Sequence, residues 1–228
     1  MDNILELQNI TKVYGTSVKT QVLTDINISF KKGSFSSIIG QSGSGKSTLL
    51  NIMGTLDEPS SGKVFIDGTE TSRLSKNALA DIRNKKIGFV FQFHYLLPEF
   101  TAIENVLMPY RISKGAVDKG AVERAKELME ITGLAEVMNN NATKMSGGQQ
   151  QRTAIARALL NNPDMILADE PTGNLDSNST ENIYNLLRDI NEKFGTTFII
   201  ITHDRRIAEM ADRIVEISDG KINVDIFK

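Results

Sequence analysis

One eight-residue loop constrains this chain more than any other feature of its sequence. Residues 40–47 read Gly-Gln-Ser-Gly-Ser-Gly-Lys-Ser and fit the pattern G-x-x-x-x-G-K-[ST] at every fixed position. An apolar run at 35–39 predicts a strand before this loop, and an apolar stretch at 48–53 predicts a short helix that ends at Gly54. A strand, a glycine-rich loop and a helix in this order are typical of a phosphate-binding loop.

The residue types in this loop suit the binding of a nucleotide. Glycines allow consecutive backbone N–H groups to surround phosphate oxygens, and the helix N-terminus adds the positive end of its dipole. We expect Lys46 to reach the β- and γ-phosphates and the Ser47 hydroxyl to bind Mg²⁺. A chance glycine-rich turn is the alternative, and the flanking strand and helix disfavour it. The remaining predicted nucleotide-binding residues of the loop are Gly40, Ser42, Gly43, Ser44, Gly45 and Thr48.

Two later apolar runs predict a parallel sheet. Residues 165–168 and 198–201 show no polar alternation, which is typical of strands buried on both faces. The segment between them carries a helical stripe that closes at Gly195, so the three elements form a right-handed crossover unit. Further strands are expected at 4–13, 22–30, 35–39, 63–67 and 87–91. Because the segment at about 93–160 is more helical and more polar, the sequence predicts a three-layer α/β domain with a helical insertion.

Two adjacent carboxylates follow the strand expected at 165–168. Ligands of open α/β sheets bind at the carboxyl ends of the strands, so Asp169 and Glu170 should face the glycine-rich loop. Because successive side chains of a strand point to opposite sides, the two carboxylates should have different roles. We expect Asp169 to hold Mg²⁺ through its water shell and Glu170 to polarise the attacking water. A solvated acidic pair that opens the loop at Pro171 is the alternative.

A histidine ends the next strand of the predicted sheet. His203 follows the apolar run at 198–202 and should therefore reach the same sheet edge as the two carboxylates. This position favours a hydrogen-bonding role beside the terminal phosphate. An ordinary surface histidine is the alternative.

Composition excludes several classes of function. The 228 residues include no cysteine, which rules out disulfides, thiol catalysis and cysteine-bound zinc or iron–sulfur clusters. The net charge of −2 carries no basic excess, so no nucleic-acid partner is expected. No apolar run approaches the roughly 18 residues that span a bilayer, and the first residues lack the pattern of a secretory signal. We expect the chain to meet a membrane only through a partner.

Residues 145–152, Met-Ser-Gly-Gly-Gln-Gln-Gln-Arg, precede a helix with a strong apolar stripe. Together with the loop at 40–47 and the motifs at 168–170, 174–176 and 202–204, they make the chain resemble the ATP-binding subunits of ABC transporters over nearly its whole length. This resemblance implies an ATPase that uses ATP and Mg²⁺. It also implies a P-loop NTPase core with a RecA-like, mostly parallel sheet, an N-terminal antiparallel β subdomain and an inserted α-helical subdomain.

The resemblance further implies a division of the chain. Residues 1–228 form a single ABC-type ATPase domain, with the nucleotide-binding core at 1–92 and 161–228 and the helical signature subdomain at about 93–160.

The family signature implies a site shared between two chains. Ser146, Gly147, Gly148 and Gln149 match it, and in the family it completes the ATP site of the opposite protomer, so that a homodimer encloses two ATP molecules. A serine hydroxyl, glycine amides and a helix N-terminus together suit an anion. A simple helix cap formed by Ser146 is the alternative.

Three more residues receive roles from the resemblance alone. Gln92 matches the glutamine that senses Mg²⁺ and the attacking water, Tyr14 the aromatic residue that stacks on adenine, and Asp176 the loop that communicates across the dimer. A core tyrosine is the alternative for Tyr14, and a turn or cap role is the alternative for Asp176. The apolar segment at 93–100 is either core of the helical subdomain or a groove for a permease helix.

The resemblance extends to a subgroup. Residues 88–102 are similar to the lipoprotein-releasing LolD group, and residues 168–176 are shared by that group and the MacB-type exporters. Thr55 and the run of glutamines at 149–151 depart from the LolD pattern, and residues 202–206 also resemble haem-export ATPases, so the cargo stays open. The implied protein binds peripherally to the cytoplasmic side of the cell (inner) membrane through integral membrane permease subunits.

Other ABC-type ATPases remain as alternatives. A cell-division ATPase that signals through a membrane partner and a haem or antimicrobial export ATPase both fit the motifs. Soluble ATPases of chromosome handling, DNA repair or translation fit poorly, because the chain has no room for a long coiled coil, no cysteine and a single cassette.

Overall fold

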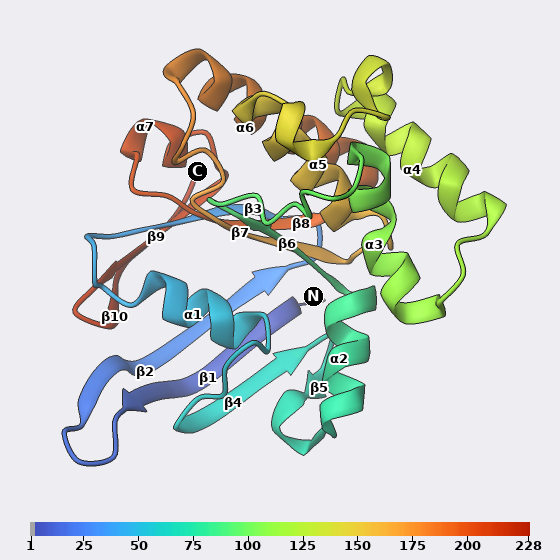
Figure 1. Ribbon diagram of the computed structural model, residues 1–228. Coiled ribbons are helices and arrows are strands. Elements are labelled where there is room, and N and C mark those ends of the chain that lie inside the picture. The colour runs from blue at the N-terminus through green and yellow to red at the C-terminus, as the bar shows by residue number, and fades with distance from the viewer. Residues whose placement is uncertain (1–2) are drawn as a thin grey trace.

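The computed structural model of the chain describes residues 3–228 and arranges them in three layers (Figure 1). A six-stranded sheet in the order β10-β9-β3-β8-β7-β6 forms the middle layer. Helices α3 to α6 lie over one face of this sheet, and α1 with a four-stranded sheet in the order β2-β1-β4-β5 lies over the other (Figure 1). The first two positions of the core segment expected at 1–92 lie outside the described residues.

The middle sheet is mostly parallel. Its parallel strands are β3 (Phe35–Ile39), β6 (Ile87–Phe91), β7 (Met165–Asp169), β8 (Thr197–Ile201) and β9 (Arg213–Ser218). The last strand, β10 (Lys221–Phe227), pairs antiparallel with β9 at the edge. The four parallel strands expected from apolar runs are confirmed to within one residue.

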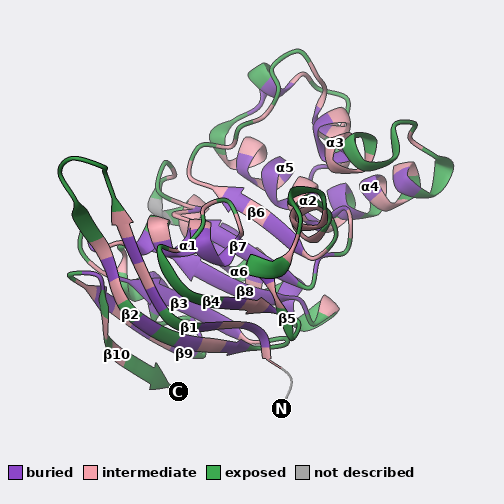
Figure 2. Cartoon of the chain, turned by 90° about the horizontal axis from the view of Figure 1, so that it is seen from below, coloured by how far each residue is buried: buried purple, intermediate pink, exposed green. Residues whose placement is uncertain are grey.

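Successive side chains of the parallel strands enter two different cores. In β7, Met165 and Leu167 pack with α1 and the antiparallel sheet, whereas Ile166 and Ala168 pack with the helices of the other layer. Figure 2 shows the result as buried central strands, while β10 and the turn between β1 and β2 are exposed. Burial on both faces is the reason that these strands are apolar without interruption.

The antiparallel sheet confirms the expected N-terminal β subdomain. It consists of β1 (Asn3–Tyr14), β2 (Thr20–Lys31), β4 (Ser61–Ile66) and the short β5 (Thr69–Glu70). Asp67 and Gly68 join β4 to β5 with φ of 49° and 74°, as a two-residue hairpin turn that follows the strand twist requires.

Seven α-helices occupy the described part of the chain. They are α1 (Lys46–Met53), α2 (Lys76–Lys85), α3 (Ala102–Lys114), α4 (Lys119–Ile131), α5 (Gly147–Leu159), α6 (Ser177–Phe194) and the short α7 (Arg205–Ala208). The segment at 93–160 supplies α3, α4 and α5, while its first residues form a loop. Helix α6 ends at Gly195 in the left-handed region, as expected. Within residues 3–228, no helix combines the length and apolarity needed to cross a bilayer.

Candidate nucleotide-binding site

The glycine-rich loop connects β3 to α1 at the edge of the sheet where the parallel strands have their carboxyl ends. Gly45 immediately precedes α1 and has a left-handed φ of 102°. A Cβ atom at this position would lie 2.8 Å from Cδ2 of Leu23 and 2.9 Å from the carbonyl oxygen of Val22. Glycine is therefore required here both by backbone conformation and by the close approach of β2.

Two polar groups of this loop are arranged as an incoming phosphate would need them. The buried Lys46 donates from Nζ to the carbonyl oxygens of Gly40 and Gln41, each at 2.8 Å. The buried hydroxyl of Ser44 has no hydrogen-bond partner among the described residues. Because buried polar groups are normally paired, these groups fit a phosphate ligand in the loop.

A cavity of about 400 Å³ brings the predicted motifs together. It joins the loop to the ends of β7 and β8, as expected from the sheet topology. Val22 also lines it, a contact that sequence reasoning missed because a valine in a strand carries no chemical signal. The lining residues are Val22, Ser42, Gly43, Gly45, Lys46, Ser47, Thr48, Asp169, Glu170, Ile201 and His203.

Asp169 is the half-buried last residue of β7. Burial raises the pKa of its carboxyl group, while a hydrogen bond with Ser47 and the charge of Lys46 act in the opposite direction. A carboxylate beside a hydroxyl fits Mg²⁺, which takes few protein ligands when phosphates and water complete its shell. No cluster of three or more histidine or acidic side chains within residues 3–228 offers an alternative cation site.

Glu170 and His203 are in direct contact across the ends of β7 and β8. The Glu170 Oε2 atom lies 2.8 Å from Nδ1 of His203. The backbone N–H of Glu170 donates to the carbonyl oxygen of Ile201 at 3.0 Å, and its φ is 48°. Left-handed backbone is rare for a residue other than glycine and persists only where neighbouring contacts stabilise it. The contacts of Glu170 with Ile201 and His203 therefore fix the position of its carboxylate.

Gln92 lies beside the loop that follows Glu170 and outside the lining of the cavity. Its Nε2 donates to Oδ1 of Asn174 at 3.2 Å, and Nδ2 of Asn174 donates to the carbonyl oxygen of Gln92 at 3.1 Å. Sequence reasoning noted Asn174 only as part of a motif and gave it no role, because its partner is 82 positions away.

Tyr14 is an exposed residue at the end of β1, so the alternative of a core tyrosine is wrong. Its hydroxyl donates to Oδ2 of Asp57 at 2.6 Å, and Nζ of Lys12 lies 4.7 Å from the ring centroid. The hydrogen bond to Asp57, and then burial, raise the pKa of Tyr14. These contacts fix the ring at the surface, and its stacking on adenine stays a prediction.

The signature and Asp176 form helix caps within this chain. The Ser146 hydroxyl accepts from the backbone of Gln149, whose side chain accepts from the backbone of Ser146. Asp176 accepts from the N–H and hydroxyl of Ser179 at 3.0 Å and 2.7 Å. Neither motif lines the cavity over the glycine-rich loop. Both residues cap helices, and their roles across a dimer stay predictions.

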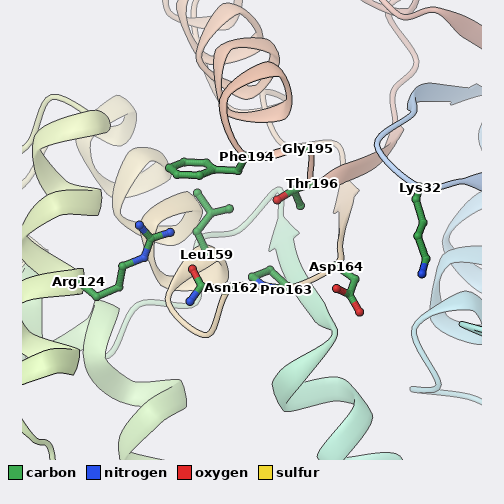
Figure 3. Close-up of a pocket in the computed structure, with 9 residues that line it drawn as sticks. All are labelled: Lys32, Arg124, Leu159, Asn162, Pro163, Asp164, Phe194, Gly195 and Thr196. Atoms are coloured by element: carbon green, nitrogen blue, oxygen red, sulfur yellow. The ribbon is translucent and has the colours of Figure 1, made fainter.

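A second cavity lies at the opposite end of the parallel strands, where residues 163–164 and 195–196 enter β7 and β8 (Figure 3). Its volume is about 250 Å³. The guanidinium of Arg124 stacks over Phe194, 5.1 Å from the ring centroid. No motif residue lines this cavity, so the chemistry is concentrated at the carboxyl ends of the strands. The lining residues are Lys32, Arg124, Leu159, Asn162, Pro163, Asp164, Phe194, Gly195 and Thr196.

A phosphate-binding loop that faces Asp169, Glu170 and His203 across one edge of a parallel sheet defines a P-loop NTPase. The chain belongs to the ABC transporter family, whose model matches residues 23–173. It is the ATP-binding, ATP-hydrolysing subunit of a membrane ABC transporter, as the resemblance implied.

The chain is similar to individual members of this family over nearly its full length. It is 51% identical to the lipoprotein-releasing system ATP-binding protein LolD 1 of Rhodopseudomonas palustris, over 97% of this chain and 99% of that protein. It is 49% identical to LolD of Bacteroides thetaiotaomicron, over 97% and 100%. Among solved structures, the dimeric post-hydrolysis state of the ATP-binding cassette MJ0796, bound to ADP and Pi, is 44% identical with a TM-score of 0.89 and 98% coverage of both chains.

Proposed function

We propose that this chain is the Mg²⁺-dependent ATPase of a lipoprotein-releasing transporter. The relatives at 49–51% identity that carry this name support the cargo class. MacB-like export, cell-division signalling and haem or antimicrobial export are the remaining alternatives. The cavity that joins the glycine-rich loop to Asp169, Glu170 and His203 carries the catalytic part of the proposal.

Five residues that line the cavity have roles in hydrolysis. The Lys46 ammonium exchanges the carbonyl oxygens of Gly40 and Gln41 for the β- and γ-phosphates. Ser47 and Asp169 would hold Mg²⁺, which would neutralise phosphate charge when bound. Glu170 accepts a hydrogen bond from the attacking water and polarises it, while the His203 side chain orients the Glu170 carboxylate and contacts the terminal phosphate.

The signature motif supports a homodimer that encloses ATP. Helical geometry at Gly147 and Gly148 does not require glycine, and a Cβ at Gly148 would meet nothing within 4 Å inside this chain. Small residues there leave the backbone N–H groups at the start of α5 open to a phosphate from outside. We therefore assign each ATP to Lys46 of one protomer and Ser146 of its partner, with Asp176 near the interface.

Exposed aromatic residues in the segment after Gln92 support a contact with a membrane partner. Phe93 and Tyr95 are 62% and 66% exposed, so the alternative of a purely core segment is wrong. Arg157 of α5 fixes this segment by donating to the carbonyl oxygens of His94 and Tyr95, each at 2.7 Å. Aromatic residues held rigidly at the surface are typical of protein interfaces. We assign them to the contact with an integral membrane permease, on the cytoplasmic side of the cell membrane.

Replacing Glu170 with glutamine tests the catalytic proposal. Glu170→Gln should bind a fluorescent ATP analogue normally but slow hydrolysis of Mg-ATP about 10²–10⁴-fold, the usual contribution of general-base help. Glu130→Gln, on α4, is the matched control and should hydrolyse ATP at the wild-type rate. Near-normal turnover of Glu170→Gln would remove Glu170 from this role.

A further inference from the structure

Two side-chain amides, Gln92 and Asn174, are interlocked beside the proposed catalytic carboxylate. Asn174 donates from Nδ2 to the backbone carbonyl oxygen of Gln92, and the Gln92 side chain donates from Nε2 back to Oδ1 of Asn174. The contact joins the end of β6 to the loop that leads from Glu170 to α6. It therefore connects Gln92 to the chain segment that carries Glu170.

The chemistry of the groups determines which way both amides point. A backbone carbonyl oxygen can only accept, so Asn174 must present its NH₂ group to Gln92. The oxygen of Asn174 is then left at the other end of the amide and can only accept, so Gln92 must present its own NH₂ group. The remaining atom, Oε1 of Gln92, accepts no hydrogen bond from the residues that the structure describes.

Gly173 holds the same side chain in place by close packing. A Cβ at position 173 would lie 2.8 Å from Nε2 of Gln92 and 3.0 Å from its Cδ. Gly173 is not in the left-handed region, so an added Cβ there would displace the Gln92 side chain rather than strain the backbone. Two neighbouring residues thus fix the position and the orientation of one amide.

We propose that Asn174 is a positioning residue that keeps the carbonyl oxygen of Gln92, rather than its NH₂ group, available to Mg²⁺ and the attacking water. Mg²⁺ and a water proton both require an oxygen acceptor, and a flipped amide would present a donor instead. This inference rests on the metal-sensing role that the family resemblance implies for Gln92, and it adds the residue that sets the orientation of the Gln92 amide.

Asn174→Leu tests the inference because leucine fills a similar volume and forms no hydrogen bond. Manganese binding is measured by electron paramagnetic resonance in the presence of a non-hydrolysable ATP analogue. We expect Asn174→Leu and Gly173→Ala to weaken Mn²⁺ binding about 3–10-fold and to leave metal-free binding of the analogue unchanged. Asn161→Leu is the matched control, because Asn161 also donates to a backbone carbonyl, that of Asn84 at 3.1 Å, but lies away from Gln92.

Gln92→Ala separates this inference from the role of Gln92 itself. If Gln92→Ala weakens Mn²⁺ binding and Asn174→Leu adds nothing on that background, the positioning role is supported. If Gln92→Ala weakens binding but Asn174→Leu alone does not, the positioning role is overturned and the role of Gln92 stands. If Gln92→Ala has no effect, both are overturned. The Gln92 side-chain NH₂ signals of the nucleotide-free protein give a metal-independent readout, and they should shift in Asn174→Leu but not in Asn161→Leu.

Discussion

At the scale of single residues, Thr55 adopts a backbone conformation that β-branched side chains rarely tolerate. Its φ is 56°, and the guanidinium of Arg83 donates to its carbonyl oxygen at 3.0 Å and to its hydroxyl at 3.3 Å. Left-handed backbone costs a residue other than glycine about 1–2 kcal/mol. Thr55 is therefore a strained position directly after α1 and Gly54.

Thr55→Gly should stabilise the protein by about 0.5–1 kcal/mol. Relief of the left-handed strain exceeds the extra entropy that a glycine loses on folding, about 0.5–1 kcal/mol, and the hydroxyl contact to Arg83 is long. Urea unfolding measures the difference. Thr55→Ala, which removes the hydroxyl and keeps a Cβ, should give no comparable gain, and a lower urea midpoint for Thr55→Gly would contradict the argument.

Residue identities were predictable where fixed spacing and a strand end specify the chemistry. The loop at 40–47, Asp169, Glu170 and His203 follow strands whose carboxyl ends must meet, and they line one cavity. Asn174 was not predictable, because its role depends on an amide that arrives from a distant strand. The proposed role of Ser146 toward a second chain was not predictable from spacing, because the groups that it would meet belong to another copy of the chain.

At the scale of elements, a buried hydrogen bond joins α6 to the parallel sheet. The hydroxyl of Tyr184, a fully buried residue of α6, lies 2.8 Å from the hydroxyl of Ser37 in β3. The Tyr184 ring also meets Phe35 edge-on at 5.7 Å between centroids. Burial raises the pKa of Tyr184 to about 12, which the Ser37 hydrogen bond partly opposes.

Tyr184→Phe should change both the stability and its dependence on pH. Near pH 7 the variant should lose about 1–2 kcal/mol, because Ser37 keeps a buried hydroxyl without its partner. The folded protein retains the Tyr184 proton up to about pH 12, whereas the unfolded chain releases it near pH 10. The proton-linked stability is therefore full below pH 10 and is lost between pH 10 and 12, about 2–3 kcal/mol in total.

Urea unfolding at a series of pH values measures this effect. The free energy of unfolding of the wild type should fall to that of Tyr184→Phe and then below it between pH 10 and 12, because the proton-linked loss exceeds the difference at pH 7. Tyr95→Phe, which removes an exposed tyrosine hydroxyl, is the matched control for the substitution itself. A difference between Tyr184→Phe and the wild type that stays constant from pH 7 to 12 would contradict the argument.

Helices and strands were predictable from the sequence where their side chains are completely buried. β7 and β8 are covered on both faces and were located from apolar runs alone. β9 is partly exposed on alternate residues and β10 is mostly exposed at the sheet edge, so neither carries a continuous apolar signal. Helix α2 has no fully buried residue and was missed for the same reason.

At the scale of the whole molecule, the two motifs that we propose to contact ATP lie in separate places on the chain. The glycine-rich loop lies between β3 and α1, whereas Ser146 begins α5 in the helical layer and does not line the cavity over the loop. Under the arrangement proposed above, one chain would carry half of each of two sites. Closure around ATP then requires a second copy with its halves exchanged, as the rotational symmetry of a homodimer provides.

Complementation between two defective chains tests this arrangement. A Lys46→Ala chain is mixed with a Ser146→Arg chain, and both carry Glu170→Gln so that bound ATP persists. If each ATP lies between Lys46 of one protomer and Ser146 of the other, the heterodimer has one interface with both defects and one with neither. Occluded ATP, measured by rapid filtration, should then appear in the mixture and be nearly absent from either variant alone. A site built within one chain would leave one defect in every site, so heterodimers without retained ATP would return Ser146 to the role of a plain helix cap.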